Sequence, residues 1–206
     1  MKSTIFDIDI TAPTCNHNNP SDNVHIYEFI IPILAAFAVE YFTLQFGAMS
    51  CFPDNQDSIQ GDKLTFVASY SLEELDCKLI IHYHGIREYK LLFPFVTDVS
   101  LQERLGNFYR EAEIAFENAS WLSFMLMCGA IFEGILFAKL GQNKSFNDLI
   151  CDASSQSLID QHTVSIMNKV RGYRNLVHAN KHTYPYVSRM DSMDTRITLD
   201  KLIKAV

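Results

Sequence analysis

The feature that most constrains this chain is a long apolar stretch from Ala119 to Leu140, which Gly141 follows at once. A segment of this composition has to be buried, either in a membrane or inside a folded protein. Small and polar residues interrupt it before it reaches the roughly 20 apolar residues that a membrane span needs. These residues are Ser123, Gly129, Glu133 and Gly134. The stretch therefore predicts the central helix of a bundle, ended by glycine.

The segments around this stretch also have helical patterns. Apolar residues recur at helical spacing from Leu101 to Asn118, and Asp98 and Ser100 are suitable N-caps. Downstream we expect a short helix capped by Ser145 and reaching Ile150, then a loop over residues 152–157. A long helix should follow, which Pro185 ends by Tyr184 at the latest, and a weak helix should run from Leu199 to Ala205.

The first half of the chain shows strand patterns instead. Alternation predicts a strand over residues 4–10, followed by a polar loop from Thr11 to Asn23. The hydrophobic run from Val24 to Met49 contains Pro32 and two glutamates, so it predicts a buried helix or strand pair rather than a membrane span. Three later segments predict an antiparallel meander, namely Leu64–Ser71, Cys77–His84 and Glu88–Phe95.

The change of period near residue 97 divides the chain. With 206 residues, 48% of them hydrophobic, the chain can form one medium domain or two small ones. We expect an α+β protein: a small strand-rich antiparallel region over residues 1–97, followed by an all-α helical bundle over residues 98–206.

Charge is distributed unevenly along the chain. The net charge of -7 argues against non-specific coating of nucleic acid or of anionic membranes. Residues 162–206, however, carry eight Lys/Arg and three Asp/Glu, a net charge of +5, which leaves -12 for residues 1–161. This contrast suits a specific anionic ligand, although attraction between the two parts of the chain would produce it as well.

Cysteine and histidine spacing gives no reason to expect a metal or a cofactor. The five cysteines are widely spaced without a C-x-x-C pair, which is typical of reduced cytosolic thiols. His82 and His84 share one face of an expected strand, but no third ligand lies nearby in sequence.

Acidic residues interrupt the N-terminal segment where a signal peptide needs an apolar core. We therefore expect a cytoplasmic protein.

The segment from Val170 to His182 concentrates the chemically capable side chains. At helical pitch, one stripe carries Arg171, Asn175, His178 and His182, with Arg174 at its edge. The opposite face is apolar and suited to burial; it carries Ile166, Val170, Tyr173 and Val177.

Arginine and histidine together can cut an RNA phosphodiester without a metal. Arginine binds phosphate oxygens and stabilises the charge that develops on the phosphorane. Histidine acts as general base toward the ribose 2'-hydroxyl or as general acid toward the leaving oxygen. The same side chains on a helix face are also commonly only solvated, so the stripe by itself does not decide between the two interpretations.

Glu133 is the lone carboxylate in the apolar stretch. Burying it is costly unless it has a partner, and Arg171 or Arg174 on the neighbouring helix would be suitable. Such a pair would fix a guanidinium that points at a ligand. Alternatively, Glu133 simply emerges at the helix surface.

Residues 101–182 resemble the HEPN superfamily (higher eukaryotes and prokaryotes nucleotide-binding), in particular its bacterial branch of unknown function. The first helix of that branch carries a Tyr-Glu-Ala element, here within Phe108–Glu113. Its second helix carries an apolar-Glu-x-apolar-Leu element, here Phe132–Leu136. Its signature closes with Arg-Asn and Val-His, here Arg174–His178.

The resemblance implies an up-and-down helical bundle that forms a homodimer. In catalytic members, two copies of an R-x(4–6)-H motif meet across the dimer and form a metal-independent endoribonuclease site. Many such proteins resemble toxins or antiviral defence effectors that cleave tRNA or other RNA. Here Arg171 and His178 fit the permitted spacing, whereas Arg174 lies one residue too close to His178 but is followed by the polar residue Asn175. The resemblance thus leaves two candidates for the motif arginine.

Two hypotheses follow. The first is a dimeric HEPN-type ribonuclease in which His178 exchanges protons, Arg171 and Arg174 bind phosphate, and Asn175 orients the histidine or the phosphate. Glu133 and His182 would support this site. The expected partners are then RNA, including tRNA, a second copy of the chain, and an antitoxin or regulatory protein, with no membrane.

The second hypothesis is a non-catalytic helical module that binds RNA, a nucleotide or a protein, with residues 1–97 sensing or recruiting a partner.

Overall fold

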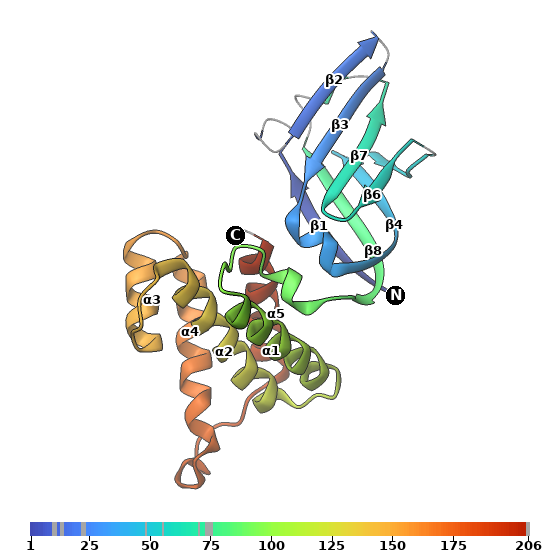
Figure 1. The fold of residues 1–206 in the computed structure, drawn as a ribbon. Coiled ribbons are helices and arrows are strands. Elements are labelled where there is room, and N and C mark those ends of the chain that lie inside the picture. Colours follow the sequence, from blue (N-terminus) through green and yellow to red (C-terminus); the bar gives the residue numbers. More distant parts are fainter. Residues whose placement is uncertain are drawn as a thin grey trace. The chain divides into compact units, whose positions relative to one another are not determined.

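The structure, a computed structural model, describes residues 1–9, 12, 15–21, 24–47, 49–54, 56–69, 71–72 and 76–204. The chain divides into two compact units, Met1–Leu91 and Leu92–Val206 (Figure 1). Strands make up the first unit and helices follow in the second, so the α+β class predicted from the sequence is confirmed.

Two antiparallel sheets form the strand unit, each with four strands in the described part of the chain. In order across the first sheet, the strands are β1 (Lys2–Ile8), β8 (Cys77–Ile86), β4 (Phe37–Phe46) and β5 (Met49–Cys51). Across the second sheet they are β2 (Cys15–Ser21), β3 (Val24–Ile30), β7 (Lys63–Ala68) and β6 (Ser58–Gln60).

Alternate residues of these strands build the core of the strand unit. In β3, Tyr27 and Phe29 are buried, and their rings stack on Phe66 of β7. Phe66 also meets Phe46 of the first sheet, with ring centroids 6.0 Å apart, so the apolar faces of the two sheets share this core. The buried Tyr27 hydroxyl accepts a hydrogen bond from the Leu72 backbone N–H at 2.9 Å.

The polar loop predicted from Thr11 to Asn23 is wrong over Cys15–Ser21, which forms β2; positions 11, 13, 14, 22 and 23 lie outside the described residues. The strand β2 lies at the edge of its sheet and pairs only with β3. Most of its side chains are exposed, so its sequence carries no apolar alternation that would reveal it.

The run from Val24 to Met49 contains two strands, β3 and β4, joined by the 3-10 helix Pro32–Ala36. The two strands belong to different sheets. The predicted meander is also wrong, because β7 and β8 lie in different sheets and Tyr89–Leu92 forms a 3-10 helix. Leu92 and Phe93 are adjacent and both buried, which a strand with one solvated face does not allow.

The helical unit has five α-helices in the part of the chain that the structure describes. They are α1 (Val99–Glu117), α2 (Trp121–Leu140), α3 (Phe146–Ser155), α4 (Gln161–Arg174) and α5 (Arg189–Lys204). The predicted cap at Asp98 is confirmed by its bond from the Leu101 N–H, and that at Ser145 by its bond from the Asp148 N–H. Gly141 ends α2 in the left-handed conformation, with φ of 63°.

The helix α2 is central to this unit, since it packs against each of the other four helices (Figure 1). By length and composition it is the one described helix that would be able to cross a membrane. Eight of its residues are buried within the unit: Phe124, Met125, Cys128, Gly129, Ile131, Phe132, Ile135 and Leu136. Its apolar composition is therefore accounted for by its place as a core helix.

Three predicted helix bounds need correction. The helix α3 runs to Ser155 rather than Ile150, because Leu149, Ile150 and Ala153 continue its buried face. The helix α5 begins at Arg189 rather than Leu199. Its buried side chains include Ser192, Thr195 and Thr198, so hydrophobicity reveals only its last turns. The third correction, the early end of α4, changes the candidate site.

Candidate functional site

The helix α4 ends at Arg174, ten residues before the latest end predicted from Pro185. A 3-10 helix follows over Asn175–Val177, and His178 has an extended backbone with φ of -82° and ψ of 126°. Val170 is the last buried residue of α4, and Val177 is 54% exposed although it was predicted to face the core. Without burial beyond Val170, packing does not hold the chain helical, and Asn175 serves as the C-cap.

Four predicted site residues nevertheless share one open, mainly polar groove at the end of α4. Its lining consists of Asn168, Arg171, Gly172, Arg174, Asn175 and His178. His182 lies in the turn after the 3-10 helix Ala179–Lys181 and does not line the groove. The arrangement thus depends on the turn after α4 rather than on one continuous helical stripe.

The predicted pairing of Glu133 with an arginine is confirmed. Arg174 Nη1 lies 2.9 Å from Glu133 Oε2, and the two side chains are 42% and 36% exposed. The stem of Arg174 lies against α2 at Gly129, where a Cβ would come within 3.2 Å of Arg174 Cδ. A partly exposed ion pair adds little to stability, so its main effect is to hold the guanidinium in one place beside the groove.

Arg171 has a different kind of partner. Its Nη1 donates a hydrogen bond to Oδ1 of Asn147, near the start of α3. Because this acceptor is a neutral amide, the bond orients the guanidinium without cancelling its charge. Sequence reasoning missed Asn147, since no local pattern connects it to a residue 24 positions away.

His178 is exposed beside these arginines. Its backbone N–H donates to the Asn175 carbonyl oxygen at 3.2 Å. In the described portion of the chain, its imidazole has no hydrogen-bond or ion-pair partner. Both ring nitrogens are therefore available to a ligand or to a second protein chain.

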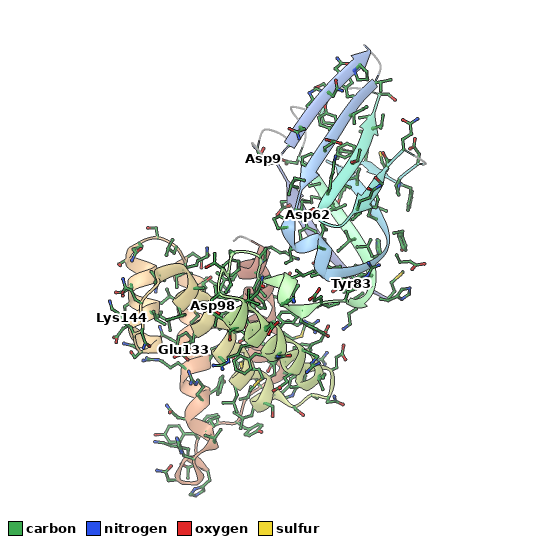
Figure 2. All side chains as sticks on the ribbon, viewed as in Figure 1. Asp9, Asp62, Tyr83, Asp98, Glu133 and Lys144 are labelled. Carbon is green, nitrogen blue, oxygen red and sulfur yellow. The ribbon has the colours of Figure 1, made fainter. Side chains whose placement is uncertain are left out.

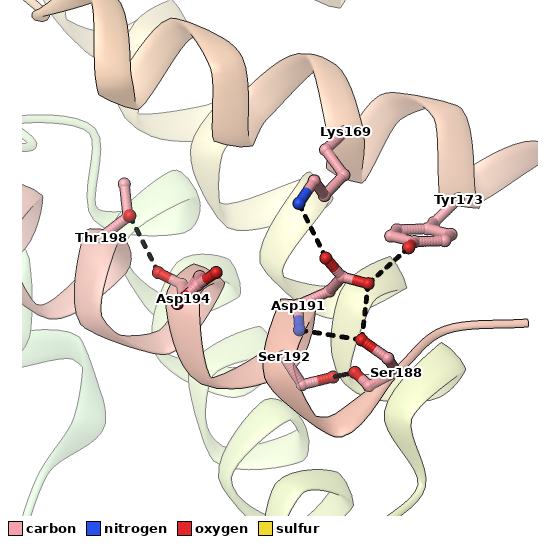
Figure 3. A network of polar contacts seen from close by, with 7 residues as sticks. All are labelled: Lys169, Tyr173, Ser188, Asp191, Ser192, Asp194 and Thr198. Atoms are coloured by element: carbon pink, nitrogen blue, oxygen red, sulfur yellow. Dashed lines mark hydrogen bonds and ion pairs between the residues drawn. The ribbon is translucent and has the colours of Figure 1, made fainter.

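The side of α4 away from the groove is attached to α5 through Asp191 (Figure 3). The Asp191 carboxylate accepts hydrogen bonds at 2.7 Å from Lys169, Tyr173 and Ser188. Sequence reasoning missed this network as well, although the Ser-x-x-Asp spacing from Ser188 to Asp191 is a known signal of a helix N-terminus. The network fixes the last turns of α4 behind the two arginines.

Two pKa values in this network are shifted. Burial raises the pKa of Asp191, but the hydrogen bonds from Lys169, Ser188 and Tyr173 outweigh it and bring the pKa down to about 2. Burial, together with the hydrogen bond to Asp191, raises the pKa of Tyr173 to about 12. The carboxylate is therefore ionised, and the phenol neutral, throughout the physiological range.

A metal centre has no candidate within the described ranges, where no three His, Cys, Asp or Glu side chains come together. His82 Nδ1 and the Ser3 hydroxyl share a hydrogen bond, and the His82 ring stacks on Tyr41. His84 pairs with Glu40.

The arginine and histidine groove, lined by Arg171, Arg174 and His178 at the end of α4, combines cations with a side chain that can exchange a proton. Two guanidinium groups are held at the end of one helix, and an imidazole lies on the turn that follows. Searches of protein-family models, curated proteins and solved structures found no match to this chain.

Proposed function

We propose that this protein is a cytoplasmic, metal-independent endoribonuclease of the HEPN type. The observation that carries the proposal is the groove at the end of α4, which Arg171, Arg174, Asn175 and His178 line together. The uncancelled charge of Arg171 and the guanidinium of Arg174, which Glu133 holds in place, suit a phosphodiester with one negative charge per phosphate. The histidine beside them can move a proton. The groove is open to solvent, as a site for a polymeric substrate has to be.

Cleavage of an RNA phosphodiester needs one proton to be removed from the attacking hydroxyl and one to be supplied to the leaving oxygen. An imidazole takes the proton of the ribose 2'-hydroxyl, and the 2'-oxygen then attacks the adjacent phosphorus. The bond to the 5'-oxygen breaks, and that oxygen receives a proton from an imidazolium. The products are a 2',3'-cyclic phosphate and a 5'-hydroxyl. Arg171 and Arg174 stabilise the extra negative charge on the phosphorane, and Asn175 orients the phosphate or the histidine.

A homodimer would supply the second histidine for this reaction. The segment after α4 exposes several large apolar and aromatic side chains: Val177 is 54% exposed, Tyr184 58% and Tyr186 67%. Exposed apolar side chains favour a protein contact, and a second copy of the chain can cover them in a self-complementary way. His178 of each copy would then face a shared site.

We further propose that this activity serves as a toxin or as an antiviral defence effector. RNA, with tRNA among the candidates, is then the substrate, and an antitoxin or regulatory protein is the natural control. The acidic strand-rich region would be the part that senses or recruits such a partner.

Incubation of the purified protein with total RNA and excess chelator tests the proposal. We expect cleavage by the wild type, and a loss of about 10²- to 10⁴-fold in rate for His178→Ala, because general acid–base catalysis contributes about that much. His162→Ala is the matched control, since His162 is an exposed histidine at the start of α4 that does not line the groove. Equal cleavage by wild type and His178→Ala would contradict the proposal.

One observation favours a second candidate function, a non-catalytic RNA-binding module. Within a single chain, none of the described residues orients the His178 imidazole, whereas both arginines are held by partners. Such a module would bind RNA, a nucleotide or a protein without cleaving it. In that case Arg171→Ala would weaken RNA binding, and no cleavage products would form with the wild type.

A further inference from the structure

A second groove adjoins the arginine and histidine groove within the helical unit. It is formed by α1, α2 and the segment that leads into α3, and it encloses about 280 Å³. Its lining is mainly apolar, with charged groups among the lining side chains. The lining includes Arg104, Phe108, Ala130, Glu133, Phe137 and Lys144.

The Glu133–Arg174 ion pair lies between the two grooves. Glu133 lines the second groove, whereas its partner Arg174 lines the first. The start of α3 also contributes to both grooves, because Lys144, just before the helix, lines the second groove and Asn147, in its first turn, holds Arg171 of the first. Figure 2 labels Glu133 and Lys144 in this part of the helical unit. A ligand held by the two arginines therefore has a second binding surface one side chain away.

Resting on the ribonuclease function proposed above, we propose that the second groove binds an unpaired base of the RNA whose phosphate occupies the first. Phe137 is 40% exposed, and Phe108 is partly exposed beside it, so the groove offers aromatic surface to a base. Bases of single-stranded RNA stack on such side chains, whereas paired bases are not available to them.

Charge at this groove also suits RNA. Arg104 is exposed and has no ion-pair partner within the described ranges, so its charge is available to a neighbouring phosphate. Glu133 uses Oε2 to bind Arg174, and its Oε1 remains an acceptor for an amino group of the base. A cation and a carboxylate around an aromatic surface fit a nucleotide better than a purely apolar ligand.

Binding of fluorescent eight-nucleotide RNA to the full chain tests the inference, in a His178→Ala background that keeps the RNA intact. Three ligands are compared: a single strand, the same strand with abasic nucleotides, and a duplex. We expect the single strand to bind most tightly. Phe137→Ala should weaken its binding about tenfold, since one stacked base contributes that order of affinity, and should leave binding of the abasic strand unchanged.

Two further variants make the result decisive. Ala130→Leu should also weaken binding of the single strand, because the larger side chain fills the groove without removing an aromatic face. Ile114→Ala is the control, since Ile114 is an exposed apolar residue of α1 that does not line the groove. Unchanged affinity in both Phe137→Ala and Ala130→Leu overturns the base site. If Arg171→Ala still weakens binding in that case, the proposed function stands; if none of the RNA ligands binds, both proposals fall.

Discussion

Arg174 shows how one side chain can connect packing to chemistry. Its stem lies against Gly129 of α2, its guanidinium binds Glu133, and the same guanidinium lines the candidate site. A larger residue at position 129 would come within 3.2 Å of both Arg174 and Val170. The glycine therefore allows α4 to approach α2 closely enough for the ion pair to form.

The pairing of Glu133 with one of the two expected arginines was predictable from sequence, although the Glu133 side chain is 36% exposed rather than buried. Asn147 was not predictable, because an amide in a polar segment carries no sign of which distant donor it will accept from. His178 was predicted as part of a helical stripe and by its spacing from Arg171, but the helix ends at Arg174, and it is the turn after the helix that brings His178 into the groove.

The buried hydroxyl of Thr195 gives a prediction about stability. Thr195 is fully buried, and its Oγ1 has no hydrogen-bond partner among the described residues. Thr195→Val replaces that hydroxyl with a methyl of similar shape, so we expect the free energy of unfolding to rise by about 1 kcal/mol. Urea unfolding followed by fluorescence of Trp121, the single tryptophan and a residue of α2, reports on the helical unit alone.

Thr198→Val is the contrasting variant for this measurement. Thr198 is also buried, but its hydroxyl donates to the Asp194 carbonyl oxygen at 2.9 Å. Its loss should therefore not stabilise the unit. Equal effects of the two substitutions would mean that the Thr195 hydroxyl is not an unsatisfied group.

At the scale of helices and strands, the sequence predicted the elements whose buried residues recur at a regular spacing. The bounds of α1 and α2 agree with the sequence to within two residues, because apolar residues and caps coincide at their ends. The strand β2 was missed because most of its side chains are exposed, so it has no apolar alternation, and its pairing with β3 is not visible in its own sequence. Most of α5 was missed because serine and threonine, rather than leucine, face the interior.

The contribution of the Asp191 network between α4 and α5 to the free energy of unfolding should depend on pH. Because the folded pKa of Asp191 is about 2 against an ordinary value of 3.8, its ionised form favours the folded state. That stabilisation, about 2 kcal/mol from the shift, is present above pH 4 and is lost as the pH falls through 2. In Asp191→Asn it is absent, so the difference in unfolding free energy between wild type and variant should shrink from pH 4 to pH 2.

Unfolding in urea at a series of pH values, followed by Trp121 fluorescence, checks this dependence. Tyr173→Phe keeps the carboxylate but removes one of its three side-chain donors, so it should show an intermediate change. If the unfolding free energies of wild type and Asp191→Asn changed in parallel with pH, the ionised Asp191 would not be what attaches α4 to α5.

At the scale of the whole molecule, each unit has its own buried core, and the candidate site lies entirely within the helical one. We therefore expect a fragment of residues 92–206 to fold on its own, with the helical circular dichroism of five helices and cooperative loss of Trp121 fluorescence on heating. If the ribonuclease function is right, this fragment should retain cleavage within about tenfold of the full chain. A fragment that stays unfolded would contradict the independence of the two cores.

The segment after α4 has a consequence for how activity would scale with abundance. Between Val170 and Val187, none of the described side chains is buried, so the turn that carries His178 has little local stability of its own. Contacts from a second chain would order this turn, and their formation depends on concentration. Under the proposed function, specific activity would rise with the concentration of the protein in the cell. It would be lost on dilution below the concentration at which two chains associate.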